Sequence, residues 1–209
     1  MNVAGEYQFE GSQDLVWETL IDPVVLASVL PGCEKLELVG EDEYLGELKI
    51  KVGPVQGKFK TKVNLVDIVR PDSYTMKVDG RGAPGFVKAT GNMRLSATGK
   101  GTTLNYDGDA QVGGRLASVG QRLIESSAKA IIKQTMDGLN NAVKARADAA
   151  AAGDDTPPPP PAAMAPSQTE FAAAVAKEVA KDLLPPWARA AGVVVILATV
   201  AYILYLVVT

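Results

Sequence analysis

The sequence predicts an α+β fold in which a curved seven-stranded antiparallel sheet wraps around one long helix, with two short helices after the first strand. Three observations predict it. Apolar and polar residues alternate with a period of two, as in half-buried strands, in segments between Met1 and Val112. Helix-start signals stand at Ser12 and at Asp22–Pro23, where a capping side chain precedes a proline. Apolar residues then recur at helical spacing over roughly 30 residues, from Arg115 to about Arg146.

The elements follow one another with short connections. The predicted strands are Met1–Glu10, Leu36–Gly40, Tyr44–Val52, Gln56–Val69, Tyr74–Gly80, Phe86–Ala97 and Thr102–Val112. The helix capped by Ser12 carries Leu15 to Leu20, and a second helix, Val24–Leu30, ends before Pro31–Gly32. Consecutive short turns favour an antiparallel meander. This order is the helix-grip arrangement, in which the sheet and the long helix enclose an elongated apolar cavity.

The alternation predicts one apolar, covered face of the sheet and one solvated face. Lysines at 49, 51, 58, 60, 62, 77 and 88 fall on the solvated face. Those of the third and fourth predicted strands form either a docking or membrane-facing patch or an ordinary solvent-exposed surface. Small residues of the long helix would leave space above the apolar face. The candidate ligand-contacting residues are Ile50, Phe59, Val63, Leu65, Met76, Val78, Phe86, Met93, Leu95, Leu104, Tyr106, Leu116, Gly120, Leu123, Ser127 and Ile131.

After the fold, predicted at residues 1–147, the composition changes. Residues 148–166 are rich in alanine and include five consecutive prolines, which is typical of a semi-rigid spacer. Residues 167–184 open with a capping box and carry an apolar stripe. This segment is predicted to be a short amphipathic helix at a membrane surface or an exposed linker helix.

The last segment, 187–209, is predicted to be a transmembrane tail anchor. Ala190–Val208 contains no charged residue and no proline. As a helix it would span roughly 28 Å, close to the hydrocarbon thickness of a bilayer. Lys177, Lys181 and Arg189 precede it, which favours a folded domain facing the cytoplasm from the inner membrane. The alternatives are a buried hydrophobic helix and a terminal oligomerisation helix.

Composition argues against several classes of function. The 209-residue chain has no histidine, one cysteine and a formal net charge of −3. A nearly neutral chain provides no overall field for nucleic acid, and the lone Cys33 excludes an intrachain disulfide or a thiolate metal cluster. No catalytic residue, metal site or covalent cofactor is predicted, and Tyr7, Tyr74 and Tyr106 are interpreted as core tyrosines. The sequence therefore predicts a binding protein, not an enzyme.

Several spaced motifs resemble the carbon monoxide dehydrogenase G-subunit family, which belongs to the START-like, helix-grip superfamily. They are Asp22–Pro23, Leu30–Glu34 (LPGCE), Lys51–Pro54 (KVGP) with Phe59, and Val112–Ile124 (VGGRLASVGQRLI). The resemblance covers about residues 1 to 145. It implies an accessory protein of an aerobic molybdenum carbon monoxide dehydrogenase, or of a related molybdenum hydroxylase, with a ligand-binding cavity and no transferable catalytic residues.

Together these features lead to one functional hypothesis and two alternatives. The domain would bind a respiratory quinone or a similar isoprenoid lipid taken from the membrane, and would recruit the dehydrogenase there for electron transfer. Its opening would be framed by the Arg81–Phe86 loop, the Pro31–Cys33 turn and the start of the last helix. The alternatives are a recruitment scaffold without a ligand and a maturation factor for the molybdenum enzyme.

Overall fold

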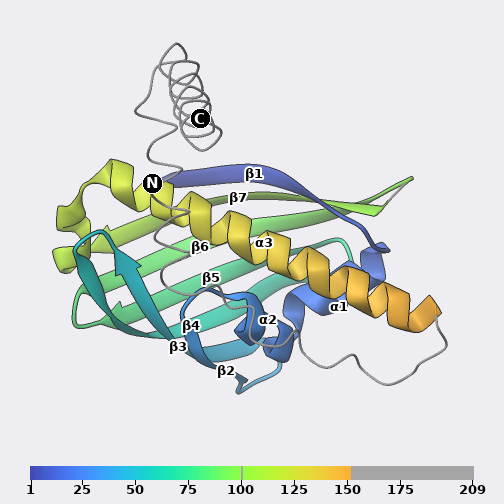
Figure 1. Ribbon diagram of the computed structural model, residues 1–209, viewed down its shortest axis with the longest axis horizontal. Coiled ribbons are helices and arrows are strands. Elements are labelled where there is room, and N and C mark those ends of the chain that lie inside the picture. The colour runs from blue at the N-terminus through green and yellow to red at the C-terminus, as the bar shows by residue number, and fades with distance from the viewer. Residues whose placement is uncertain (100, 152–209) are drawn as a thin grey trace, which may run out of the picture.

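A seven-stranded antiparallel sheet forms the frame of the molecule (Figure 1). The computed structural model describes residues 1–99 and 101–151. The strands are β1 (Asn2–Phe9), β2 (Cys33–Leu38), β3 (Glu43–Val52), β4 (Val55–Val69), β5 (Ser73–Gly82), β6 (Gly85–Thr98) and β7 (Gly101–Gly113). Their order in the sheet is β1-β7-β6-β5-β4-β3-β2. Strands β2 to β7 therefore form the predicted meander, and β1 pairs with β7.

Two short helices, α1 (Gln13–Ile21) and α2 (Pro23–Val29), follow β1 as predicted. The hydroxyl of Ser12 accepts a hydrogen bond from the Leu15 amide at 3.4 Å and caps α1. The carboxylate of Asp22 accepts from the amides of Val24 at 2.8 Å and Val25 at 3.3 Å and caps α2. Both caps satisfy amides that have no partner inside the helix.

The predicted start of the long helix is wrong by several residues. A 3₁₀ segment, η1 (Gly114–Val119), comes first, and α3 (Gln121–Ala151) begins only after Gly120. Gly120 has φ 92°, a conformation that glycine adopts without the steric penalty of a side chain. The backbone therefore changes direction at Gly120, which divides the predicted helix into two elements.

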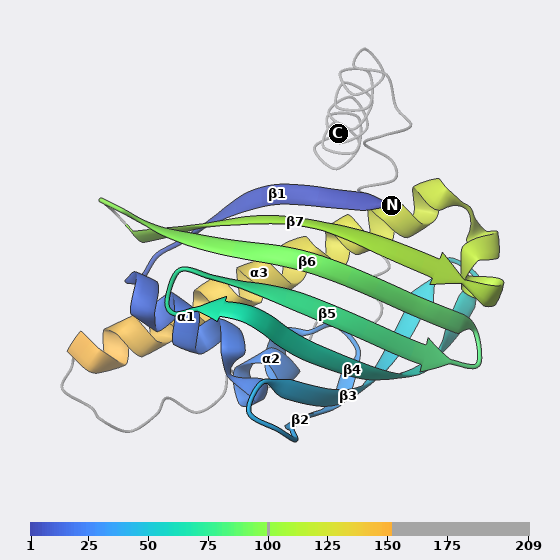
Figure 2. The ribbon, with the colours of Figure 1, turned by 180° about the vertical axis from the view of Figure 1, so that it is seen from behind.

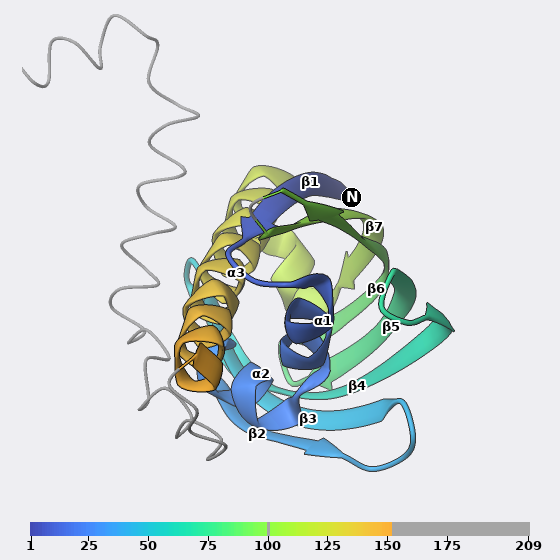
Figure 3. The same cartoon turned by 90° about the vertical axis from the view of Figure 1, so that its right-hand side faces the viewer.

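The sheet curves around α3, which confirms the helix-grip arrangement. Seen along the molecule, α1 and α2 fill one end of the space between α3 and the strands (Figure 3). From behind, the opposite face of the sheet lies in front of α3 (Figure 2). We call the side that faces α3 the inner face and the other side the outer face.

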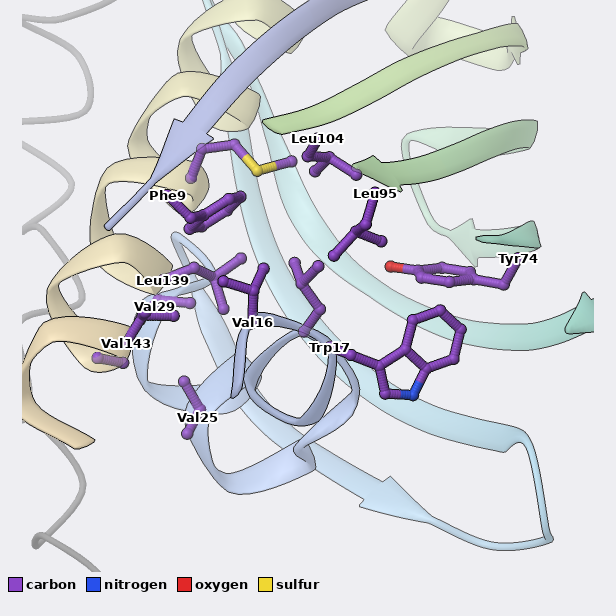
Figure 4. Close-up of a cluster of buried hydrophobic side chains, with 13 residues drawn as sticks. Phe9, Val16, Trp17, Val25, Val29, Tyr74, Leu95, Leu104, Leu139 and Val143 are labelled. Carbon is purple, nitrogen blue, oxygen red and sulfur yellow. The ribbon is translucent and has the colours of Figure 1, made fainter. Parts of the chain in front are cut away.

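The apolar core consists mainly of two clusters at the two ends of the inner face. The larger one joins α1 and α2 to β1, β5, β6, β7 and the second half of α3 (Figure 4). Its fully buried members include Val16, Leu104 and Val143. The smaller one joins Val52 and Phe59 to Leu116 of η1.

The predicted linker, amphipathic helix and membrane anchor (148–166, 167–184 and 187–209) lie almost entirely outside the described residues. Helix α3 continues to Ala151, past the predicted domain boundary at residue 147. Within residues 1–99 and 101–151 no helix is both long and apolar enough to cross a membrane.

Candidate functional site

The strand register brings the predicted apolar residues of the sheet to the inner face. Val63 of β4 lies opposite Val78 of β5, Val78 opposite Ala89 of β6, and Ala89 opposite Ala110 of β7. Leu65 and Met76 form the neighbouring inward pair, and Met93 lies opposite Tyr106. Since side chains directly opposite each other point to the same side of a sheet, one continuous apolar surface runs across β3 to β7. The predicted alternation is confirmed.

Helix α3 presents an apolar stripe toward this surface. Ile132, Met136, Leu139 and Val143 of its second half all belong to the larger cluster or pack against it. Ile124 and Ala128 precede Ile132 by eight and four residues and continue the same stripe, because residues four apart share a helix face. Both are only half-buried. The first half of the stripe is therefore not closed by packing.

The middle of the inner face is also incompletely packed. Val63, Val78, Ala89 and Ala110 are half-buried and belong to neither end cluster. Small side chains occupy its centre, because Gly91 and Gly108 continue the row formed by Leu65 and Met76. An inward residue that keeps solvent-accessible surface marks space between the sheet and α3. The candidate binding region is this partly open stretch between the two packed ends.

The sixteen predicted contact residues do not all border that stretch. Leu95 and Leu104 are 4% and 0% exposed inside the larger cluster, and Phe59 and Leu116 are 2% and 5% exposed inside the smaller one. Ile50 and Leu123 pack against the smaller cluster. These residues form packed end walls. Leu65, Met76 and Met93 lie at the border between the larger cluster and the partly open stretch, since they pack against that cluster but are only partly buried.

Phe86 was predicted to line the cavity, and the structure places it on the other face. It lies opposite Arg81 and Gly113, one residue out of phase with the inward Val87. Its ring lies over Gly113, where a side chain would collide with it, and the residue is 39% exposed. Successive side chains of β6 point to opposite faces of the sheet. Because Val87 points inward, Phe86 belongs to the outer face.

The two small residues predicted near the start of α3 differ in their surroundings. Ser127 is buried, but its hydroxyl donates to the Leu123 carbonyl of its own helix at 2.7 Å. Ser127 precedes Ile131 by one helical turn and Thr135 by two, so the three residues share one face of α3. Gly120 is exposed at the η1–α3 junction, and nothing lies within 4 Å of where its Cβ would be. It borders open space, not a closed wall.

Sequence reasoning missed two polar atoms of α3. The Thr135 hydroxyl and the Gln134 side-chain oxygen are buried without a hydrogen-bond partner in the described structure. Thr135 is 8% exposed and follows the half-buried Ile131 by one helical turn. A mid-helix threonine ordinarily donates to the carbonyl of its preceding turn, so the sequence contained no signal of an unpaired hydroxyl. An unpaired buried hydroxyl costs free energy and is available to a ligand.

Two of the inward tyrosines, Tyr7 and Tyr74, have structural partners. The Tyr7 hydroxyl donates to the Asp137 carboxylate at 2.9 Å and ties β1 to α3. Burial, followed by the hydrogen bond to Asp137, raises the pKa of Tyr7. Tyr74 packs edge-on against Trp17, and burial raises its pKa as well. Tyr7 and Tyr74 therefore fit the prediction of core residues, whereas Tyr106 is only half-buried.

Cys33 is half-buried, and its thiol lies 3.5 Å from the Lys35 carbonyl. Burial raises the pKa of this thiol, and the hydrogen bond to Lys35 opposes the effect. A thiol with a raised pKa is a poor nucleophile at neutral pH.

A hollow lies on the outer face of the sheet and differs in character from the half-buried inner stretch. It has a volume of about 360 Å³. Its polar lining includes Lys62, Asn64, Lys77, Asp79, Lys88, Thr90, Asp109 and Gln111. Such a lining does not suit an apolar ligand.

Comparison with known proteins identifies the family. The family model of the carbon monoxide dehydrogenase G subunit (CoxG) matches residues 5–144. The chain belongs to the CoxG family. The name of the family associates it with carbon monoxide dehydrogenase, and no curated protein matches the chain.

Solved structures agree with the fold. A conserved protein from Geobacillus kaustophilus is 35% identical with a TM-score of 0.66, and the match covers 69% of this chain and 96% of that one. A START superfamily protein from Mycobacterium smegmatis is 12% identical with a TM-score of 0.54, over 69% and 97% of the two chains. The Zhui aromatase/cyclase from Streptomyces is 17% identical with a TM-score of 0.53, over 72% and 97%. The two distant similarities establish a START-like fold and nothing about chemistry.

Proposed function

We propose that this CoxG family member binds a hydrophobic ligand between α3 and the inner face of the sheet, as an accessory protein of a molybdenum carbon monoxide dehydrogenase or a related molybdenum hydroxylase. The ligand we propose is a respiratory quinone or similar isoprenoid lipid. The observation that supports it is the half-buried apolar stretch around Val63, Val78 and Ile124, between two packed ends. An elongated apolar space with few polar groups suits such a molecule.

The polar atoms of the site favour a ligand with a polar head. The unpaired hydroxyl of Thr135 lies on the face of α3 that Ile131 shares. A quinone carbonyl or hydroquinone hydroxyl would supply the missing hydrogen bond, whereas a plain hydrocarbon would leave it unmade. The described residues position the ligand and shield it from water, and the electron chemistry belongs to the ligand and the partner enzyme.

Membrane recruitment completes the proposal. Segment 187–209 would hold the domain at the cytoplasmic side of the inner membrane, where hydrophobic small molecules concentrate. The linker at 148–166 would let the domain reach both the bilayer and the dehydrogenase. In this role the protein carries ligand and docks an enzyme without catalysing a reaction.

The decisive experiment extracts ligand from the full-length protein isolated from membranes and identifies it by mass spectrometry. The test variant is Val78→Phe, which adds a ring at the centre of the inner face beside Ala89. Asn105→Phe adds the same ring at an exposed outer-face position of β7 and serves as the control. We expect a quinone or isoprenoid lipid from the wild type and the control, and little from Val78→Phe.

Two further measurements keep the result interpretable. Circular dichroism establishes that Val78→Phe is folded, and Ala110→Leu provides a smaller filling change if it is not. Recruitment of the dehydrogenase to membranes should persist in both folded variants. Wild-type protein that yields no lipid, while it still recruits the enzyme, would refute ligand carriage and favour the scaffold.

A further inference from the structure

The outer face of the β3–β4 hairpin carries a dense row of lysines, away from the ligand site on the inner face. Residues 49–62 contain five lysines and no acidic residue. All five point outward, because along each strand they alternate with inward residues such as Leu48, Ile50 and Phe59. We call Lys49, Lys51, Lys58 and Lys60, the four nearest the tip, the hairpin lysines.

The hairpin lysines are only partly compensated by carboxylates of the chain. Lys49 lies directly opposite Lys58, and like charges in that position destabilise a strand pair. Lys58 bonds Glu34 at 2.6 Å and Lys60 approaches Glu47 at 4.0 Å. Lys49 and Lys51 have no carboxylate partner within the part of the chain that the structure describes. A positive surface therefore remains at the tip.

The composition of this surface distinguishes between two kinds of partner. Protein interfaces concentrate aromatic and apolar residues at their centre and are depleted of lysine. The outward positions of the hairpin, from Glu47 to Lys51 and from Gln56 to Lys60, are all polar. Exposed lysine clusters of this kind suit the diffuse negative charge of an anionic phospholipid surface.

The hairpin also lies beside the half-open part of the inner face. A Cβ at Gly53, in the turn, would lie 2.7 Å from the Leu123 side chain of α3. Gly57 lies against Pro84 of the β5–β6 turn, which in turn leads to the exposed Phe86. The lysines, the exposed ring of Phe86 and the start of α3 thus occupy one end of the molecule.

We infer that the hairpin lysines bind the anionic headgroup surface of a phospholipid membrane and orient this end of the domain toward the bilayer. The orientation rests on the proposed function, since it would bring the half-open stretch to the source of its ligand. The proposed membrane contact is argued from the hairpin lysines alone. An experiment that refutes the membrane contact would therefore leave the proposed ligand binding untouched.

The test uses residues 1–151, without the proposed anchor, in vesicle flotation. We expect this part to fold on its own, because the match with the 35% identical Geobacillus protein covers 96% of that chain. We expect it to float with vesicles of phosphatidylcholine and phosphatidylglycerol, not with phosphatidylcholine alone, and to dissociate as ionic strength rises. Removing three membrane-facing lysines should lower the partition coefficient about a hundredfold.

Two triple variants with the same loss of charge complete the design. Lys49→Gln/Lys51→Gln/Lys58→Gln removes hairpin lysines, and Lys129→Gln/Lys133→Gln/Lys144→Gln removes three from α3. We expect only the first to lose binding, with both variants folded by circular dichroism. Equal losses in both would overturn the assignment of the surface. Wild-type protein that ignores anionic vesicles, or that binds only an acidic protein partner, would overturn the membrane contact.

Discussion

Asp22 connects two parts of the fold with its two carboxylate oxygens, which makes its contribution to stability separable by mutation. Oδ1 accepts from the amides of Val24 and Val25 and caps α2. Oδ2 accepts from the guanidinium of Arg146, near the end of α3, and Arg146 also donates to the Thr19 hydroxyl at 3.3 Å. The Asp22 and Arg146 side chains are 25% and 22% exposed. The pair is therefore partly shielded from water.

The structure gives a different cost for each substitution. Asp22→Ala loses the cap, worth about 1 kcal/mol, and the charge-assisted hydrogen bond, worth about 2 kcal/mol, so unfolding should become easier by about 3 kcal/mol. Asp22→Asn keeps a capping oxygen and should lose only about 2 kcal/mol. Arg146→Met should lose about 2 kcal/mol for the same bond and about 1 kcal/mol more for its hydrogen bond to Thr19.

The assay is urea denaturation of residues 1–151, followed by the fluorescence of Trp17, the one tryptophan in that part of the sequence. The double variant Asp22→Asn/Arg146→Met should cost little more than Arg146→Met alone, since both single variants remove the Asp22–Arg146 interaction. Equal destabilisation by Asp22→Ala and Asp22→Asn would refute the separate cap. Additive losses in the double variant would refute the coupling between α2 and α3.

Three other predictions concern the pKa of Asp22, a buried core residue and the unpaired hydroxyl of Thr135. Burial acts to raise the pKa of Asp22, but the hydrogen bonds from Arg146 and the two amides outweigh it and the pKa is lowered. The stability that the Asp22 carboxylate contributes is present above the ordinary aspartate pKa and is lost as the pH falls through the lowered pKa. Asp22→Asn should therefore be less acid-sensitive than the wild type in urea titrations at different pH values. Leu104→Ala empties a fully buried position and should cost about 3 kcal/mol in the same denaturation assay, whereas exposed Val24→Ala should cost little. Thr135→Val removes a buried hydroxyl without a partner, so it should stabilise the empty domain in thermal unfolding yet weaken its binding of added quinone; unchanged binding would exclude Thr135 from the site.

The element order was predictable because each signal is local. The caps at Ser12 and Asp22 lie where the sequence indicates, and the register confirms which strand residues face inward. The start of α3 was not predictable from spacing, since the apolar period continues through Leu116 and Leu123. A single positive φ at Gly120 interrupts the helix there, and glycine tolerates but does not require it.

The candidate site was predictable only in part, for a related reason. Alternation identifies Val63 and Val78 as inward, but it does not say whether a neighbouring element covers them. Phe86 was misplaced because it was assigned from its place in the predicted entrance loop, whereas the alternation of Met93 and Leu95 already puts it on the opposite face. Small size alone did not reveal that the Ser127 hydroxyl bonds its own helix, and the contact of Ser127 with a ligand stays a prediction.

By itself the sequence determined the class of fold, its element order and the separation of an apolar from a lysine-rich sheet face, since backbone propensity and side-chain period are local properties. Only the tertiary structure decided which apolar residues close the two ends and which remain half-buried between them. Packing depends on the distance and rotation of α3 relative to the strands, which are set by contacts between distant residues such as Tyr7 with Asp137 and Asp22 with Arg146.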